Sequence, residues 1–222
     1  ELPRVLLSRY ESAKESRPRD LQQELLRETA LESWADFRAR SVERALIPLV
    51  NEGRSRELGI GLDLYSPSLS LLVGQSYHRL ARHDDWIKPM TYFRAPGPAG
   101  FPVEWASLTK GLRHWEAALS QEAAEGAATA ITGFSPGSSD REIPHHIIGE
   151  LALARRLLEE NPVRIFPGVE LVDIPALRIR TDERVARRIL EPLRQHCSDL
   201  SVSWNTLLIS KESATVVGAL YG

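Results

Sequence analysis

Acidic and aromatic side chains gather where four short apolar segments of the sequence end. Three carboxylates are the candidate catalytic groups: Glu170, Asp63 and Glu104. Carboxylates that face one cleft from different strands can cleave a glycosidic bond, because one protonates the leaving oxygen while the other attacks the sugar or activates water. The candidate substrate-binding residues around them are Tyr65, Lys88, Tyr92, Arg94, Asp173, Trp204 and Asn205. An indole offers a sugar ring a flat apolar face, so this set of residues predicts a carbohydrate ligand.

The four apolar segments are predicted β-strands, over residues 58–65, 86–93, 163–172 and 200–204. A helix-length segment follows each strand, and apolar residues recur at helical spacing in these segments. The predicted helices cover residues 71–82, 105–125, 144–160 and 211–220, with one more that Thr181 caps. A long helix, or two joined ones, runs from Asp20 to about Gly53 before the first strand. Proline and glycine mark residues 95–102 as a loop, which brings Glu104 and Trp105 towards the rim.

The alternation of strands and helices predicts an α/β fold with a parallel sheet of the (β/α) TIM-barrel type. We find four strand–helix units, which is half of an eight-stranded barrel. Half a barrel leaves two open sheet edges and an exposed interior. The missing strands therefore lie upstream in a longer polypeptide or come from another chain, or else the sheet is open and covered on both faces. No linker divides residues 1–222, so we expect a single domain.

The composition is that of an ordinary soluble globular protein and fits a cytoplasmic or a secreted one. Hydrophobic residues make up 42% of the 222 residues, and the formal net charge is −2, so neither a nucleic-acid partner nor a membrane partner is expected. No apolar run reaches the roughly 18 residues of a membrane span. The single cysteine, Cys197, excludes an internal disulfide.

Other chemistries have weaker support in the sequence. Lys88 could form a Schiff base with a carbonyl substrate, as lysines in some barrel aldolases do. His146 and Glu150 are spaced i, i+4 and could share a metal, but a third ligand is not evident. The only sequence feature that favours Cys197 as a nucleophile is the neighbouring His196. We therefore expect no metal and no cofactor.

Several phrases of the sequence resemble the C-terminal half of glycosidase-like (β/α)8 barrels. They are Gly61-Leu-Asp-Leu-Tyr-Ser-Pro67, Val73-Gly-Gln-Ser-Tyr77, Asp85-Trp-Ile-Lys-Pro-Met-Thr-Tyr92, Phe166-Pro-Gly-Val-Glu170 and Ser201-Val-Ser-Trp204. The resemblance is closest to glycosyl-hydrolase domains of uncharacterised bacterial proteins and more distant to chitinase-type enzymes. It covers roughly residues 34–220 and implies that the four strands are the fifth to eighth of a barrel.

The resemblance also implies roles for individual residues. Tyr92 corresponds to the tyrosine that faces the scissile sugar, and Trp204 corresponds to the tryptophan that forms the floor of the sugar site. Glu170 corresponds to a nucleophile at the end of the seventh strand. Phe93 stands where chitinases carry an aspartate, and the fourth strand with its acid/base carboxylate is not visible. Three hypotheses follow: a glycoside hydrolase, a catalytically inactive barrel that binds a glycan or a protein, and a Schiff-base aldolase or lyase.

Overall fold

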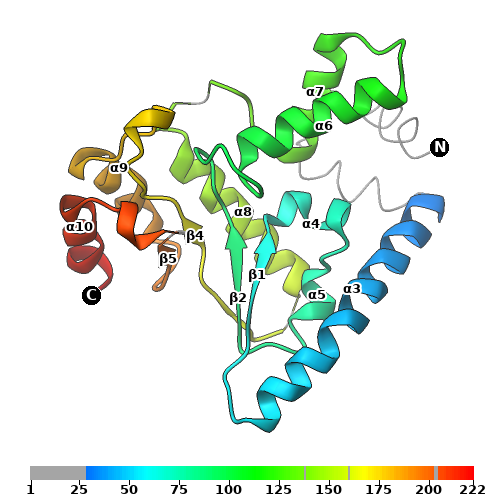
Figure 1. Cartoon of the computed structure of the whole chain (residues 1–222), viewed down its shortest axis with the longest axis horizontal. Helices are drawn as coiled ribbons and strands as arrows, with labels where there is room; N and C mark the ends of the chain where they lie inside the picture. Colours follow the sequence, from blue (N-terminus) through cyan, green and yellow to red (C-terminus); the bar gives the residue numbers. More distant parts are fainter. Residues whose placement is uncertain (1–28, 138, 160, 203–204) are drawn as a thin grey trace.

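The structure is a computed structural model, and it describes residues 29–137, 139–159, 161–202 and 205–222. It is an α/β fold whose short parallel strands are flanked by helices (Figure 1). The predicted start of the long helix, residues 20–28, lies outside the described residues, as does Trp204. Among the described residues, no helix is long and apolar enough to cross a membrane.

The strands form two small parallel sheets. In the first sheet, β1 (Gly61–Tyr65) pairs with β2 (Trp86–Met90), and β2 pairs with β3 (Arg164–Ile165). In the second sheet, β4 (Gly168–Val169) pairs with β5 (Ser201–Val202). The predicted strand over residues 163–172 is therefore two short strands, and the segment that contains them joins the two sheets. The backbone N–H of Phe166 still donates to Ile87 O at 2.9 Å, and that of Ser201 donates to Pro167 O at 2.9 Å.

The helices begin and end at residues whose chemistry favours those positions. The long helix α3 (Thr29–Ser55) precedes β1, and two short helices follow it, α4 (Pro67–Val73) and α5 (Tyr77–Leu80). We predicted one helix over residues 71–82. It is divided because Gly74 adopts a left-handed φ of 74°, which ends α4, and because Ser76 then caps α5 through its side chain.

The predicted helix over residues 105–125 is also divided. It forms a hairpin of α6 (Phe101–Trp115) and α7 (Gln121–Thr132), in which the Ser120 side chain accepts from Ala123 N–H at 3.1 Å and so caps α7. The hairpin has a small apolar core around Leu112 and Ala124, against which Trp34 of α3 and Leu72 of α4 also pack, and its outer part projects from the rest of the molecule (Figure 1). Helical spacing continues across the break, so periodicity alone did not reveal the turn.

The C-terminal helices match the expected ranges more closely. They are α8 (Ile143–Leu158), α9 (Glu183–Leu193) and α10 (Lys211–Tyr221), with 3₁₀ turns at Pro175–Leu177 and Thr206–Leu208. The predicted cap of α9 is wrong by one residue. Asp182 accepts from Val185 N–H at 2.8 Å, whereas the Thr181 hydroxyl donates to Val172 O at 2.7 Å.

The two faces of the first sheet differ in character. Leu64 and Ile87 pack in an apolar core with residues of α5 and α8. Because side chains alternate along a strand, Asp63 and Lys88 lie on the opposite face, which we call the inner face. Trp86 also lies there, edge-on to Phe166 with ring centroids 5.7 Å apart.

Candidate functional site

The centre of the inner face carries an ion pair next to a tyrosine. Asp63 and Lys88 are partners in the parallel register, and Lys88 Nζ lies 2.6 Å from Asp63 Oδ2. Burial lowers the pKa of Lys88, but the hydrogen bond to Asp63 and the neighbouring Tyr92 hydroxyl outweigh it and raise the pKa above its ordinary value. The ammonium therefore stays charged. Half of the Asp63 side chain is exposed, so a ligand on this face would meet a carboxylate.

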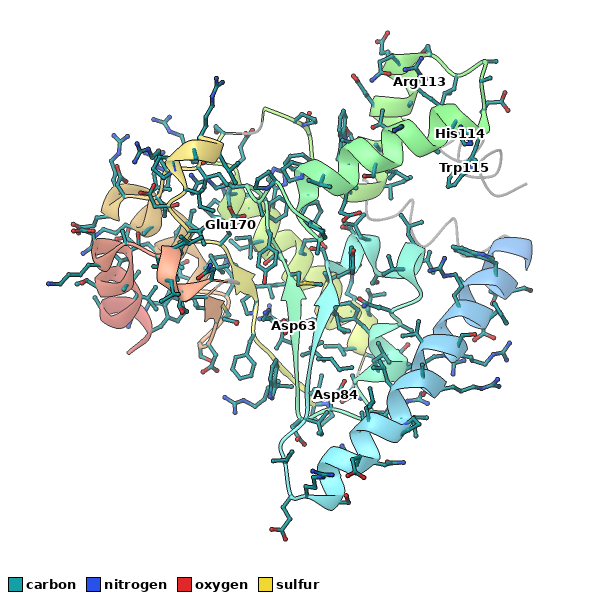
Figure 2. The ribbon with its side chains drawn as sticks, viewed as in Figure 1. Asp63, Asp84, Arg113, His114, Trp115 and Glu170 are labelled. Carbon is teal, nitrogen blue, oxygen red and sulfur yellow. The ribbon has the colours of Figure 1, made fainter. Side chains whose placement is uncertain are left out.

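Glu170 follows β4 and faces the same side. Val169 and Leu171 lie in the apolar core against α8 and α9, so alternation directs Gly168 and Glu170 towards the inner face. The contacts of Tyr92 agree with this, because its ring lies over Gly168, where an added Cβ would be 3.1 Å from Cε1. Figure 2 shows Asp63 and Glu170 on different strand segments.

The carboxyl of Glu170 is nearly closed to solvent. The residue is 4% exposed, its Oε2 accepts from Arg94 N–H at 3.1 Å, and its Oε1 has no hydrogen-bond partner among the described residues. Burial raises the pKa of Glu170 to about 7, although the Arg94 backbone N–H and guanidinium oppose the rise. Glu170 therefore exchanges a proton near neutral pH.

The charges of both carboxylates, Asp63 and Glu170, affect the pKa of Tyr92. Burial raises its pKa, Lys88 lowers it, and the charges of Asp63 and Glu170 both raise it further. The cluster of Asp63, Lys88, Tyr92 and Glu170 is the candidate site. The sequence predicted all four, and the structure brings them together.

Arg94 contributes to this site through its backbone. Its guanidinium donates to Thr181 Oγ1 at 2.7 Å and to Arg180 O, and Nε lies 3.5 Å from Asp140 Oδ1. The Arg94 side chain thus connects its own loop near Glu170 to the loops that contain Asp140 and Thr181. Asp140 and Thr181 were missed as contributors because nothing in their local sequence indicates which distant residue they contact.

Tyr65 and Glu104 form the edge of the site next to the hairpin. The Glu104 side chain accepts from Ala99 N–H at 2.9 Å and so braces the loop that precedes α6. Burial raises the pKa of Tyr65, and the charge of Glu104 raises it further, so the two side chains are close. Glu104 therefore holds the loop before α6 and lies beside Tyr65, and its catalytic role stays a prediction.

The remaining predicted residues have structural partners. Asp173 accepts from Thr181 N–H at 3.2 Å and lies 3.7 Å from an Arg180 nitrogen. Asn205 accepts from Leu207 N–H at 3.1 Å and caps a 3₁₀ turn. Both residues therefore organise loops beyond the strand ends. Trp204 lies outside the described residues, so its predicted stacking role stays a prediction.

The metal alternative gains no support from the described part of the chain. Glu150 is buried and accepts from Ser68 N–H at 2.9 Å, while the His146 ring stacks on Phe93 with centroids 5.1 Å apart. No group of three or more His, Cys, Asp or Glu residues within the described ranges is arranged to hold a metal ion.

Comparison of the whole sequence with known proteins gives no further guide to this site. No protein-family model matches the chain, and no match is found among curated proteins or among solved structures. The function is therefore inferred from the residues and geometry of the site.

Proposed function

We propose that this chain forms part of a glycosidase-like β/α barrel and hydrolyses a glycan, with Glu170 as the general acid/base. The observation that carries the proposal is the buried carboxyl of Glu170 at the end of β4, whose pKa is raised to about 7. A carboxylic acid that keeps its proton near neutral pH can protonate a leaving oxygen, which a carboxyl of ordinary pKa does poorly.

Asp63 is the second carboxylate of the proposed reaction. It lies on the same face as Glu170, but it is half exposed and paired with Lys88. The enclosed Glu170 and the half-exposed Asp63 differ in environment, as the general acid and its partner carboxyl do in glycoside hydrolysis. Tyr92, close to both, would hydrogen-bond the sugar or the developing charge.

The strand arrangement supports the barrel part of the proposal. The parallel strands follow one another in space in sequence order, from β1 to β2 and then through β3 and β4 to β5, as barrel strands do. The other strands would come from an upstream segment or from another chain.

The test is Glu170→Gln assayed on a panel of glycans that the unchanged chain cleaves. We expect hydrolysis to fall by about 10²–10⁴-fold, the usual contribution of a positioned acid/base. Glu212→Gln, at an exposed carboxylate on α10, serves as the matched control. Unchanged hydrolysis in Glu170→Gln would contradict the assignment.

A catalytically inactive, glycan-binding barrel is the second candidate. The 4% exposure of Glu170 favours it, because a sugar reaches this carboxyl only if a surrounding loop moves. Calorimetry with a glycan panel separates the two candidates, since binding without turnover fits only the inactive barrel. The Schiff-base alternative is disfavoured because an ammonium of raised pKa, such as that of Lys88, is a poor nucleophile.

A further inference from the structure

A hollow lies on the α6–α7 hairpin, outside the candidate site. It has a volume of about 210 Å³ and is lined by Trp105, Ala106, Thr109, Lys110, Arg113 and Gln121. Pockets for drug-sized ligands measure roughly 300–1,000 Å³, so this hollow suits a single small group or one sugar unit.

Helical spacing gathers its lining on one side of α6. Trp105, Thr109 and Arg113 follow one another at i, i+4 and i+8, and Lys110 lies beside them, three residues before Arg113. Gln121, the first residue of α7, closes the hollow from the other helix. Arg113 is on the outer part of the projecting hairpin (Figure 2).

The two cations of the hollow are exposed side chains. Among the described residues, neither Lys110 nor Arg113 forms a salt bridge. Arg113 donates to the neutral Gln121 Oε1 at 2.6 Å. The nearest connected carboxylate is Glu125, which accepts from Gln121 Nε2 at 2.5 Å and is thus one side chain removed from Arg113.

Thr109 is an independent indication that the hollow takes a ligand. The residue is 4% exposed, and its hydroxyl oxygen is buried with no hydrogen-bond partner in the part of the chain that the structure describes. A buried hydroxyl without a partner is costly, and a ligand oxygen in the hollow would supply one. Trp105 donates its indole N–H to Thr129 Oγ1 at 3.0 Å, which fixes the ring that borders the hollow.

We propose that this hollow is a secondary subsite for an anionic sugar unit, with Lys110 and Arg113 binding the acidic group and Thr109 binding an adjacent oxygen. The inference rests on the proposed function and names acidic glycans as its substrate class. The location fits, because α6 starts at the rim beside Tyr92, where Phe101 N–H donates to Tyr92 O at 2.8 Å. From Glu104 to Arg113 the helix rises about 14 Å, a span that a glycan chain can bridge.

The experiment measures binding by calorimetry with the whole chain and two acidic probes, a galacturonic acid tetrasaccharide and a sulfated tetrasaccharide, beside a neutral one. The two acidic probes identify which acidic group is preferred. We expect Lys110→Gln and Arg113→Gln each to weaken acidic binding about tenfold, the size of one charge-assisted hydrogen bond. Arg184→Gln, at an exposed arginine of α9, is the matched control and should bind as the unchanged chain does.

Thr109→Val separates a binding role from a structural one. It removes a hydroxyl that has no partner within the described ranges, so the thermal stability should hold or rise while acidic binding weakens severalfold. The inference is overturned if neither acidic probe binds, or if Lys110→Gln and Arg113→Gln leave the affinity unchanged. Calorimetry measures binding and not bond cleavage, so the two proposals can fail separately. If Glu170-dependent hydrolysis is observed but neither acidic probe binds, only this inference is removed. Acidic binding without Glu170-dependent hydrolysis removes only the proposed reaction.

Discussion

At the level of single residues, two buried carboxyl groups among the described residues have oxygens without a hydrogen-bond partner. Glu170 has one oxygen without a partner, and Asp84, at the opposite end of β2, has two. Burial raises the pKa of Asp84 to about 6, even though the charges of His83 and Arg54 oppose the rise. Both residues are labelled in Figure 2. Buried carboxyls of this kind favour the protonated form, so the folded state is most stable where they are neutral.

Glu170 predicts a pH-dependent stability that does not depend on any assay of activity. Its pKa rises from 4.5 to about 7 on folding, so its stabilising contribution is full below pH 4.5 and is lost as the pH rises through 7. Glu170→Gln should match the unchanged chain at pH 4.5 and exceed it at pH 8 by up to about 3 kcal/mol, since each pKa unit corresponds to about 1.4 kcal/mol. Urea unfolding at both pH values measures this difference. Equal pH profiles of the two proteins would contradict the raised pKa.

At the level of elements, the long helix α3 contacts the body through apolar side chains such as Val42 and Leu46, through a close approach to α4 and through a charged network. Gly74, at the end of α4, lies so near α3 that an added Cβ would be 2.9 Å from Arg38 Cβ and 3.1 Å from its carbonyl carbon. Arg79 of α5 lies 2.7 Å from an Asp36 oxygen and 3.3 Å from a Glu43 oxygen. His83 Nε2 lies 3.0 Å from the other Glu43 oxygen, and this hydrogen bond lowers the pKa of Glu43.

Gly74→Ala tests the contact between α3 and α4. The substitution meets a positive φ, which costs about 1–2 kcal/mol, and in addition the Arg38 backbone. Gly133→Ala is the matched control, because Gly133 ends α7 with a φ of 66° and has no atom within 4 Å of an added Cβ. Thermal unfolding should show Gly74→Ala as the more destabilised of the two. Equal losses would mean that α3 does not approach Gly74 this closely.

At the level of the whole molecule, the apolar side chains form three separate cores. One surrounds β4 with α8, α9 and α10, another lies behind β1 and β2, and the third belongs to the α6–α7 hairpin. A cavity of about 230 Å³ remains between α3 and the rest, lined in part by Ala35, Ala39, Leu153 and Leu157. The small side chains on this face of α3 allow the helix to come close but do not fill the space.

Filling this cavity should stabilise the molecule. Ala35→Leu adds apolar volume at a buried position of α3 and should raise the free energy of unfolding by about 1 kcal/mol. Ala45→Leu adds the same groups at an exposed position of the same helix and should leave stability nearly unchanged. Chemical denaturation of both variants provides the comparison. Destabilisation by Ala35→Leu alone would mean that the space cannot accept the side chain.

The sequence by itself determined the local features of this protein. Its alternating apolar segments predicted the α/β class and the parallel strands, and the residue types at strand ends predicted Asp63, Lys88, Tyr92 and Glu170 as neighbours. The α/β class and the parallel strands were predicted correctly because side-chain alternation and parallel pairing follow from backbone geometry, which is the same in every sheet.

Only the tertiary structure decided what each of these side chains does. The sequence does not reveal that Glu170 is enclosed while Asp63 is half exposed, because burial depends on loops that are distant in the sequence. The same holds for Arg94, whose partners Asp140 and Thr181 are 46 and 87 residues away. The break between α6 and α7 was hidden because apolar periodicity continues through it, and the turn itself creates the hollow that holds Lys110 and Arg113.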